Sequence, residues 1–293
     1  MERGDKRCAK RPREPVSESG QRSMHQDPRE SCTASKLPRY PFNPQFNDHF
    51  ETSVDAMRDL LPVVEAYRTL TAPGCPESFS VYDPYYCTGR IKEQWHTLGI
   101  TRVIHENRDF YEDIAANRIP KYHMLVTNPP YSGDHIQRLM EYLRRSHSSA
   151  WAFLVPDYIA EREWYVNIVS TEFSPNTVGK SRSLSSRSCP KWRPPPPPFL
   201  NGMDAGDERQ ADKPIEPFYI VPKVWYNYYH PTGAGHEKSP FRSMWFVFCG
   251  KRTNDVLREV IAKNRRDDVR YISGIAGLHE SRIVRAQPRK SSS

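Results

Sequence analysis

The sequence predicts an α/β domain with a doubly wound sheet. Two short apolar runs, at 79–82 and 122–127, each end in a proline-containing loop that leads into a segment with helical spacing. A third run, at 151–156, is apolar throughout and is typical of a buried strand. Two aromatic-rich runs, at 218–231 and 239–249, are joined by a glycine-containing stretch, which favours an antiparallel strand pair at the end of the sheet.

The domain is expected to cover about residues 45 to 250. Residues 1–44 are polar and basic and are expected to be a disordered tail, and residues 251–293 a basic C-terminal helix and tail. Residues 174–217 contain a Ser/Arg run and consecutive prolines at 194–198, so they are expected to be a disordered insert. Polyproline can bind a partner module, and the insert is therefore a candidate contact for a protein partner.

The basic charge belongs to the two ends of the chain. Residues 1–40 contribute +4 and residues 251–293 contribute +6, whereas the whole chain carries +8, so the part between sums to −2. Flexible basic arms suit the phosphates of a nucleic acid. The basic run at 6–13 also matches a nuclear import signal, which favours a nuclear over a cytoplasmic location.

Several other classes of protein are disfavoured by composition. No apolar run approaches the roughly 18 residues of a membrane span, and the N-terminus lacks the apolar core of a signal peptide. The six cysteines are scattered without a Cys-x-x-Cys pair, which argues against a zinc site or a disulfide framework. No metal site is therefore expected.

The first element expected in the domain is a helix over residues 48–70, packed on the sheet. Pro62 lies inside it and is expected to bend it or divide it in two. The apolar positions follow helical spacing: Val54, Met57, Leu60, Leu61, Val64 and Tyr67.

The next segment, at 79–98, is expected to form a strand, a tight loop and a helix. The strand breaks at Asp83 and Pro84, Tyr85 follows, and Gly89 precedes the helical segment. A loop between a strand and the N-terminus of a helix is a common place for a cofactor. An ordinary strand-to-helix turn would have the same local sequence.

A second strand is expected around residues 103–104, with Glu106 at its end. Asp109 and Phe110 follow after only two residues, so there is little room for a further helix and strand before the apolar run at 122–127. One αβ unit of the expected fold is therefore shortened. The carboxylates of Glu106 and Asp109 are candidates for ligand binding, but either could be an ordinary solvated charge.

The apolar run at 122–127 leads directly into Asn128, Pro129, Pro130 and Tyr131. Such a strand carries Asn128 to the carboxyl edge of the sheet, where open α/β sheets bind ligands. The two prolines stiffen the loop, because each fixes its own φ and Pro130 disfavours the α region for Pro129.

This loop suits the methylation of a planar nitrogen. The Asn128 side-chain carbonyl and the Pro129 main-chain carbonyl can both accept hydrogen bonds from one NH₂ group. An amino or amide nitrogen is a poor nucleophile because its lone pair is delocalised, and two acceptors favour the pyramidal form that attacks a methyl group. Tyr131 offers an aromatic face to a flipped-out base or an amide plane. A chance proline turn is the alternative.

These motifs resemble the class I S-adenosylmethionine-dependent amino-methyltransferases, which modify adenine N6, guanine N2 or a glutamine amide. Asn128 to Tyr131 is similar to the fourth motif of that family, and Asp83-Pro84-Tyr85 with Thr88-Gly89 is similar to its first, Asp-Pro-Phe-x-Gly-Ser-Gly. Cys87 departs from the pattern, because the family has its first glycine there. The resemblance covers roughly half of the chain.

The resemblance implies a Rossmann-like class I sheet and S-adenosyl-L-methionine as the cofactor. It implies that Asp83 binds the cationic amino group of the cofactor, beside Tyr85, and that Gly89 lets the next helix start against it. It further implies that Glu106 accepts hydrogen bonds from the ribose, and that Asp109 and Phe110 contact the adenine.

The remaining elements complete this plan. A helix is expected at 132–143 and a strand at 151–156, and the residues after that strand, Asp157, Tyr158 and Trp164, could border the pocket for the base. The run at 218–231 combines aromatic and basic side chains suited to stacking and phosphate binding. Strand alternation requires about half of them to face inward. The set, with one arginine from the following run, is Lys223, Trp225, Tyr226, Tyr228, Tyr229, His230 and Arg242.

The function expected from the sequence is N6-adenine methylation of RNA. DNA ranks lower because no DNA-reading module is recognisable. A glutamine methyltransferase is the first alternative, since the same tetrapeptide suits an amide nitrogen, although the basic tails argue against it. The second is a catalytically silent homologue, altered at Cys87, that binds RNA or scaffolds a partner.

Overall fold

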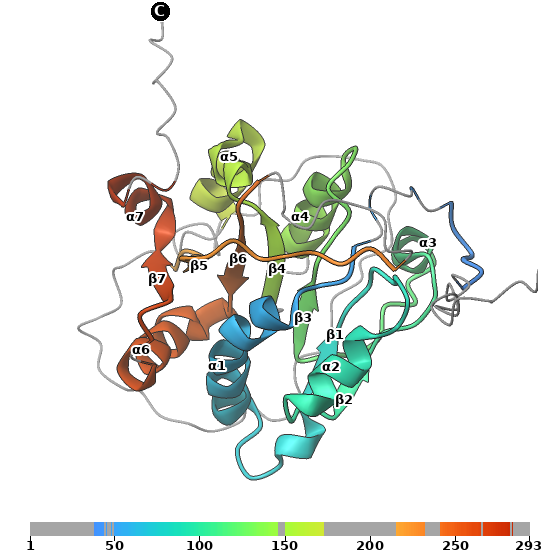
Figure 1. The fold of residues 1–293 in the computed structure, drawn as a ribbon, viewed down its shortest axis with the longest axis horizontal. Helices are drawn as coiled ribbons and strands as arrows, with labels where there is room; N and C mark the ends of the chain where they lie inside the picture. Colours follow the sequence, from blue (N-terminus) through green and yellow to red (C-terminus); the bar gives the residue numbers. More distant parts are fainter. Residues whose placement is uncertain are drawn as a thin grey trace, which may run out of the picture. The chain divides into compact units, whose positions relative to one another are not determined.

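A mixed seven-stranded sheet forms the centre of the computed structural model (Figure 1). The structure describes residues 38–283 except 44, 46–47, 49, 146–149, 173–214, 232–240, 265 and 282. In spatial order the strands are β2 (Arg102–Ile104), β1 (Ser80–Tyr82), β3 (Met124–Thr127), β4 (Ala150–Pro156), β6 (Ser243–Phe248), β5 (Phe218–Pro222) and β7 (Val269–Ser273).

Strand direction divides the sheet into two parts. The four strands β2, β1, β3 and β4 are parallel, whereas β6 is antiparallel to both β4 and β5. β5 therefore runs in the same direction as β4, and Pro222 ends it at the same edge as the ends of β1 and β3. The two aromatic-rich runs do form an antiparallel pair, with a first strand shorter than predicted, but β7 and not this pair ends the sheet. This architecture is α/β and compatible with a Rossmann-like fold.

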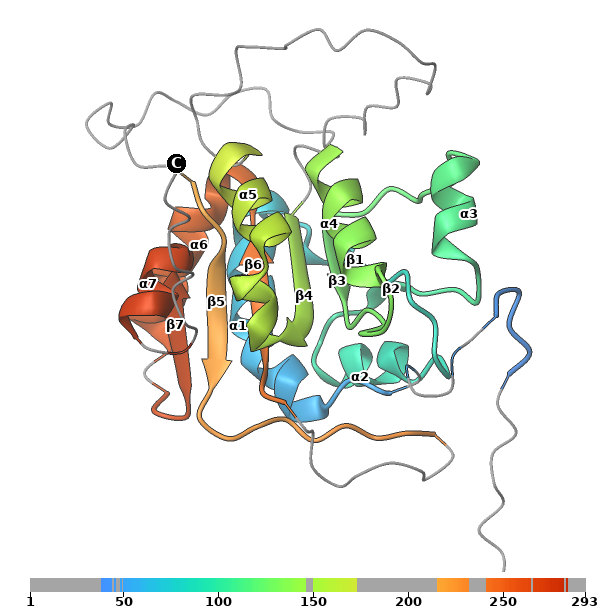
Figure 2. The same ribbon diagram turned by 90° about the horizontal axis from the view of Figure 1, so that it is seen from above.

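Helices cover both faces of the sheet (Figures 1 and 2). On one face the buried side chains come from α1 (Val54–Thr71), α2 (Ile91–Thr97) and α6 (Thr253–Lys263). On the other they come from α3 (Phe110–Ala115), α4 (His135–Arg145), α5 (Glu163–Glu172) and α7 (Gly274–Glu280). Since β3 and β4 are buried along their whole length, they have the continuous apolar sequence expected of parallel strands covered on both faces.

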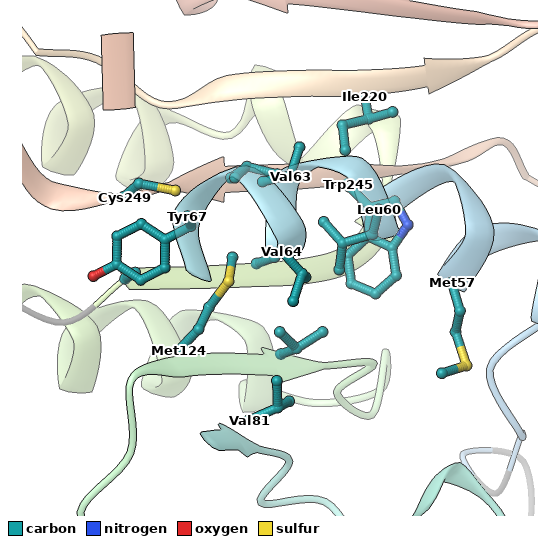
Figure 3. Close-up of a cluster of buried hydrophobic side chains, with 14 of the residues drawn as sticks. Met57, Leu60, Val63, Val64, Tyr67, Val81, Met124, Ile220, Trp245 and Cys249 are labelled. Carbon is teal, nitrogen blue, oxygen red and sulfur yellow. The ribbon is translucent and has the colours of Figure 1, made fainter. Parts of the chain in front are cut away.

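α1 packs across the centre of the sheet, as its apolar spacing predicts. Figure 3 shows its side chains over those of β1, β3, β5 and β6. Ser53 caps the helix by accepting a hydrogen bond from the Asp55 N–H at 3.2 Å. Pro62 does not divide it: the helix is continuous, and the Arg58 carbonyl that loses its helical partner lies on an exposed residue, where water can bind it.

Only α3 connects β2 to β3, so β2 is the edge strand and no further strand follows it among the described residues. The short spacing between Glu106 and Asp109 predicts this shortened unit. As a result, the residues after β2 turn directly toward the loop that follows β1.

The sheet continues past residue 250, where the sequence prediction ended the domain. Val256, Leu257 and Val260 of α6 are buried in the core, and β7 pairs antiparallel with β5. The helix expected after residue 250 is therefore a packed part of the domain. Most of the predicted tail at 1–44, most of the predicted insert at 174–217 and residues 284–293 lie outside the described residues.

Candidate functional site

The chain reverses its direction of winding between β1 and β3. From β1 it moves outward to β2, then crosses back to β3 on the other side of β1. Ligands of open α/β sheets bind outside the carboxyl ends of the strands at such a reversal. Asp83 follows β1 and Asn128 follows β3, and the Thr127 hydroxyl joins the two strand ends by donating to the Asp83 carboxylate at 2.6 Å.

Asp83 is a buried carboxylate without a cationic partner. It forms no ion pair with a lysine or arginine in the part of the chain that the structure describes. The nearest basic group is the Nδ1 of His105, 3.9 Å from Oδ2, and this nitrogen donates to the main-chain oxygen of Asp83 at 3.0 Å. Burial raises the pKa of Asp83 to about 7 and lowers the pKa of His105. Because buried charges are normally paired, this carboxylate is suited to a cationic ligand.

Glu51 is a second buried carboxylate at the same loop. It accepts hydrogen bonds from the Thr88 main-chain N–H, at 3.2 Å, and from the Thr88 hydroxyl. Its negative charge raises the pKa of Asp83 further, after the larger effect of burial. The loop after β1 is thus held between two acidic groups from distant parts of the sequence.

The conformation of this loop requires glycine at one position only. Gly89 has a φ of +90°, and a Cβ there would lie 2.8 Å from the Tyr86 hydroxyl oxygen. Cys87, where the family pattern has a glycine, is not among the positive-φ residues of the described chain. Its main-chain oxygen accepts a hydrogen bond from the Tyr40 hydroxyl at 2.8 Å. The backbone conformation therefore tolerates the cysteine.

Glu106 and Phe110 line one cavity of about 220 Å³, together with Pro84 from the loop after β1. The structure thus brings two of the three predicted residues of the second segment to the first loop. The Glu106 carboxylate is exposed and forms no ion pair within the described residues, whereas Arg108 and Arg118 on the same wall are paired with Asp113.

Asp109 has a structural role at this point. Its side chain caps α3 by accepting hydrogen bonds from the Tyr111 and Glu112 N–H groups at 2.8 and 3.0 Å. Tyr85 packs edge-on against Phe110, with ring centroids 5.3 Å apart. The Tyr85 hydroxyl lies 3.0 Å from that of Tyr111, so the first loop and α3 are in direct contact.

Asn128 has one satisfied and one unsatisfied polar atom. Its Nδ2 donates to the Phe50 main-chain oxygen at 3.4 Å. Its Oδ1 is buried and has no hydrogen-bond partner among the described residues. An unpaired buried acceptor is costly, about 1–3 kcal/mol, and such atoms are rare in native proteins. Within this loop it is the acceptor that a donor on a ligand would satisfy.

Tyr131 is fixed in place beside Asn128. Its hydroxyl donates to the Leu154 main-chain oxygen at 3.1 Å and accepts from the Tyr228 hydroxyl at 3.1 Å. Tyr228 and Phe241 contact the ring edge-on, with centroids 6.3 and 5.4 Å away. The ring plane is therefore set by packing. Pro129 is buried and Pro130 is half-buried.

The aromatic segment after β5 divides into two sides. Tyr226 and His230 are buried and Tyr228 is half-buried, whereas Trp225 and Tyr229 are exposed. This is the alternation that the sequence predicts without specifying which residues face inward.

The polar and aromatic residues predicted to border the pocket are engaged in other contacts. Arg242 forms an ion pair with Asp157 at 2.8 Å. Tyr158 packs edge-on against Phe241, and Trp164 packs edge-on against Tyr165. These last residues support the fold around the site.

Two residues of the site, Glu51 and His105, have no signal in the sequence pattern, and one contact of a third was not predicted. Glu51 precedes its contact Thr88 by 37 residues, and no local motif marks it. Tyr228 is among the aromatic residues that the sequence singles out, but its contact with Tyr131 joins positions 97 residues apart. His105 lies next to Glu106, and only its buried place beside Asp83 distinguishes it from other histidines.

Comparisons with protein-family models, with curated proteins and with solved structures found no match for this chain. Across the described residues, no group of three or more His, Cys, Asp or Glu side chains is arranged to hold a metal ion. Nor does any helix in the described ranges have the length and apolar character needed to cross a membrane.

Proposed function

We propose that this chain is a class I S-adenosylmethionine-dependent amino-methyltransferase that methylates adenine N6 in RNA. One observation carries the proposal. Two buried groups with unmet needs, the Asn128 Oδ1 and the Asp83 carboxylate, lie at the carboxyl ends of two adjacent parallel strands. The first needs a hydrogen-bond donor and the second a cation. An amino substrate beside a cationic cofactor supplies both.

The residues after β1 and β2 fit the cofactor. Asp83, with Glu51 at the same loop, is suited to the cationic amino group, and the exposed Glu106 carboxylate to the hydroxyls of a ribose. Phe110 supplies an aromatic wall in the same cavity of about 220 Å³. Asp109 fits less well, because its side chain already caps α3. When bound, S-adenosylmethionine supplies an electrophilic methyl group.

The residues after β3 fit the nucleophile. With its Nδ2 bound to the Phe50 carbonyl, Asn128 has a fixed amide orientation that leaves Oδ1 to accept from a substrate N–H. The Pro129 carbonyl is the second acceptor of this proposal. Two accepted hydrogen bonds localise the nitrogen lone pair, so the reaction needs no strong general base. Tyr131, held by the Leu154 carbonyl, borders the base or amide plane.

RNA is proposed as the substrate because the positive charge is concentrated at the chain ends, +4 over residues 1–40 and +6 over residues 251–293. A protein glutamine amide satisfies the same acceptors and is the second candidate. DNA adenine and a silent, RNA-binding role are lower alternatives. The φ of Cys87 argues against the hypothesis of a catalytically silent homologue, because the cysteine is compatible with the backbone conformation of the loop after β1.

The test is to incubate the full chain with methyl-labelled cofactor and separate fractions of RNA, DNA and protein. Label in RNA, recovered as 6-methyladenine, is expected. Asn128→Leu keeps the size of the side chain but removes the acceptor, and it should abolish most transfer while cofactor affinity stays near that of the wild type. Asn167→Leu makes the same substitution at an exposed asparagine of α5 and is the matched control. Label confined to glutamine, or full activity of Asn128→Leu, would refute the assignment.

A further inference from the structure

Residues 223–231 form an extended segment that leaves β5 at the carboxyl edge of the sheet, where Asp83 and Asn128 lie (Figures 1 and 2). Tyr226 anchors the segment by donating to the buried Asp59 carboxylate at 2.7 Å. Tyr228 donates to the Tyr131 hydroxyl, and the Tyr229 main-chain oxygen accepts from the Glu51 N–H at 2.8 Å. The segment is thus held by three contacts, and two of them, those with Tyr131 and Glu51, are contacts with residues of the candidate site.

The outward side of this segment is unusually apolar. Four large hydrophobic side chains are prominently exposed in the described parts of the chain, and three of them lie here: Val224 (79%), Trp225 (49%) and Tyr229 (53%). The fourth, Ile261, lies on α6. Single exposed apolar residues are common, but a cluster beside a site indicates a binding surface.

Cationic side chains border this surface. The guanidinium of Arg90 lies 5.8 Å from the centre of the Tyr229 ring, and Arg90 forms no ion pair with any residue that the structure describes. Lys92, half-buried on α2, is likewise without an ion pair among those residues, and both line a cavity of about 440 Å³ beside Gly89. Aromatic faces next to unpaired cations are the combination that binds unstacked bases and their phosphates.

We propose that Trp225, Tyr229 and Arg90 form a stacking surface for single-stranded RNA beside the target nucleotide. This inference rests on the proposed function for its location next to Asn128. Tyr228 faces inward and contacts Tyr131, whereas its neighbour Tyr229 faces outward. An RNA strand bound on the outer surface would therefore lie next to the loop that contains Asn128 and Tyr131. Duplex RNA hides its base faces, and therefore cannot use this surface.

Trp225 and Tyr229 bind different bases. They are four residues apart in extended chain, which spans at most about 14 Å. Their contributions should therefore be separable, and a double variant should show roughly the product of the two single effects.

The test measures binding of the full chain to a fluorescein-labelled single-stranded RNA of about 12 nucleotides containing only A and C, by fluorescence anisotropy without cofactor. Trp225→Ala and Tyr229→Ala should each weaken binding about 5- to 150-fold, the range for loss of one base–ring stack. Trp225→Phe and Tyr229→Phe keep an aromatic face and should remain close to the wild type. Ile261→Ala is the control for loss of an exposed apolar side chain.

Salt dependence separates stacking from charge. Arg90→Ala should reduce the slope of log affinity against log salt by about 0.7, the value for one phosphate contact on a single strand. The two aromatic-to-alanine variants should leave the slope unchanged. Arg58→Ala, which removes an exposed arginine of α1, should change neither.

Two outcomes would overturn the inference: wild-type affinity in both alanine variants, or equal losses for duplex and single-stranded RNA. The assay needs no methyl transfer, so the inference survives if label never enters RNA but the variants lose binding. Conversely, RNA methylation with normal affinity in the variants would leave the proposed function intact and remove this surface.

Discussion

Cofactor binding should depend on pH through Asp83. Burial raises the pKa of this carboxyl to about 7, whereas an unfolded chain has about 4. A cationic ligand binds the ionised form. Below pH 7 the protein must first release a proton, so affinity should fall by up to about tenfold for each pH unit and level off above pH 7.

The raised pKa of Asp83 also makes the stability of the ligand-free protein depend on pH. The folded state holds the Asp83 proton more tightly than the unfolded state, so the free energy of unfolding should decrease as pH rises from about 4 to 7. A shift of about three units corresponds to about 4 kcal/mol, which is an upper limit because Asp83 is one of several titrating groups. Asp83→Asn should remove this slope and make the ligand-free protein more stable than the wild type above pH 7.

Calorimetry tests both effects. Titration of S-adenosylmethionine at pH 5.5 to 7.5 in buffers of different ionisation enthalpy reports the protons released on binding. About one proton should be released near pH 6 and few near pH 7.5. The range stops at pH 7.5 so that the amino group of the cofactor stays mostly protonated, since such groups have a pKa of about 8. Constant affinity across this range, or wild-type affinity in Asp83→Asn, would show that Asp83 does not hold a cation.

Three further predictions concern the frame of the site. Gly89→Ala would place a Cβ 2.8 Å from the Tyr86 hydroxyl oxygen at a backbone φ of +90°. It should weaken cofactor binding and lower the free energy of unfolding in denaturant by about 1–3 kcal/mol. Gly99→Ala is the control: Gly99 also has a positive φ but has open space around it, so this variant should lower stability alone. Tyr226→Phe removes the hydroxyl that donates to the buried Asp59, which keeps only its ion pair with Arg266 at 2.8 Å, and should cost about 1–3 kcal/mol, measured by urea unfolding. A change below about 0.5 kcal/mol would contradict the contact. Truncation after residue 250 removes α6 and β7 and should yield an unfolded chain by circular dichroism. Deletion of residues 1–37, for which the sequence predicts a disordered tail, is the control and should leave the helical signal unchanged.

The parts of the fold that depend on local sequence were predictable. The strand ends at Asp83 and Asn128 were found because an apolar run, a proline and a helical segment follow one another within about 15 residues in both places. The shortened unit after β2 was predicted from the short spacing between Glu106 and Asp109. The continuity of α1 through Pro62 was not, because it depends on where the freed carbonyl lies relative to solvent.

The parts that depend on pairing between distant segments were not predictable. β7 is a short, half-exposed strand of mixed polarity, and only its place beside β5 gives it a partner. Asp109 was assigned to the adenine by the resemblance to the methyltransferase family, yet α3 begins at the next residue, Phe110, which makes Asp109 its helix cap. Glu51 had no motif at all. These residues become part of the site only when the sheet brings the segments together.

Residues 50 and 51 contact three separate segments of the candidate site. The Phe50 carbonyl accepts from the Asn128 amide, the Glu51 carboxylate holds Thr88 in the loop after β1, and the Glu51 N–H pairs with Tyr229. A ligand that further restricts the motion of these two residues lowers the entropy that the next ligand must remove. Cofactor and RNA should accordingly favour each other's binding, and thermodynamic reciprocity requires the two enhancements to be equal.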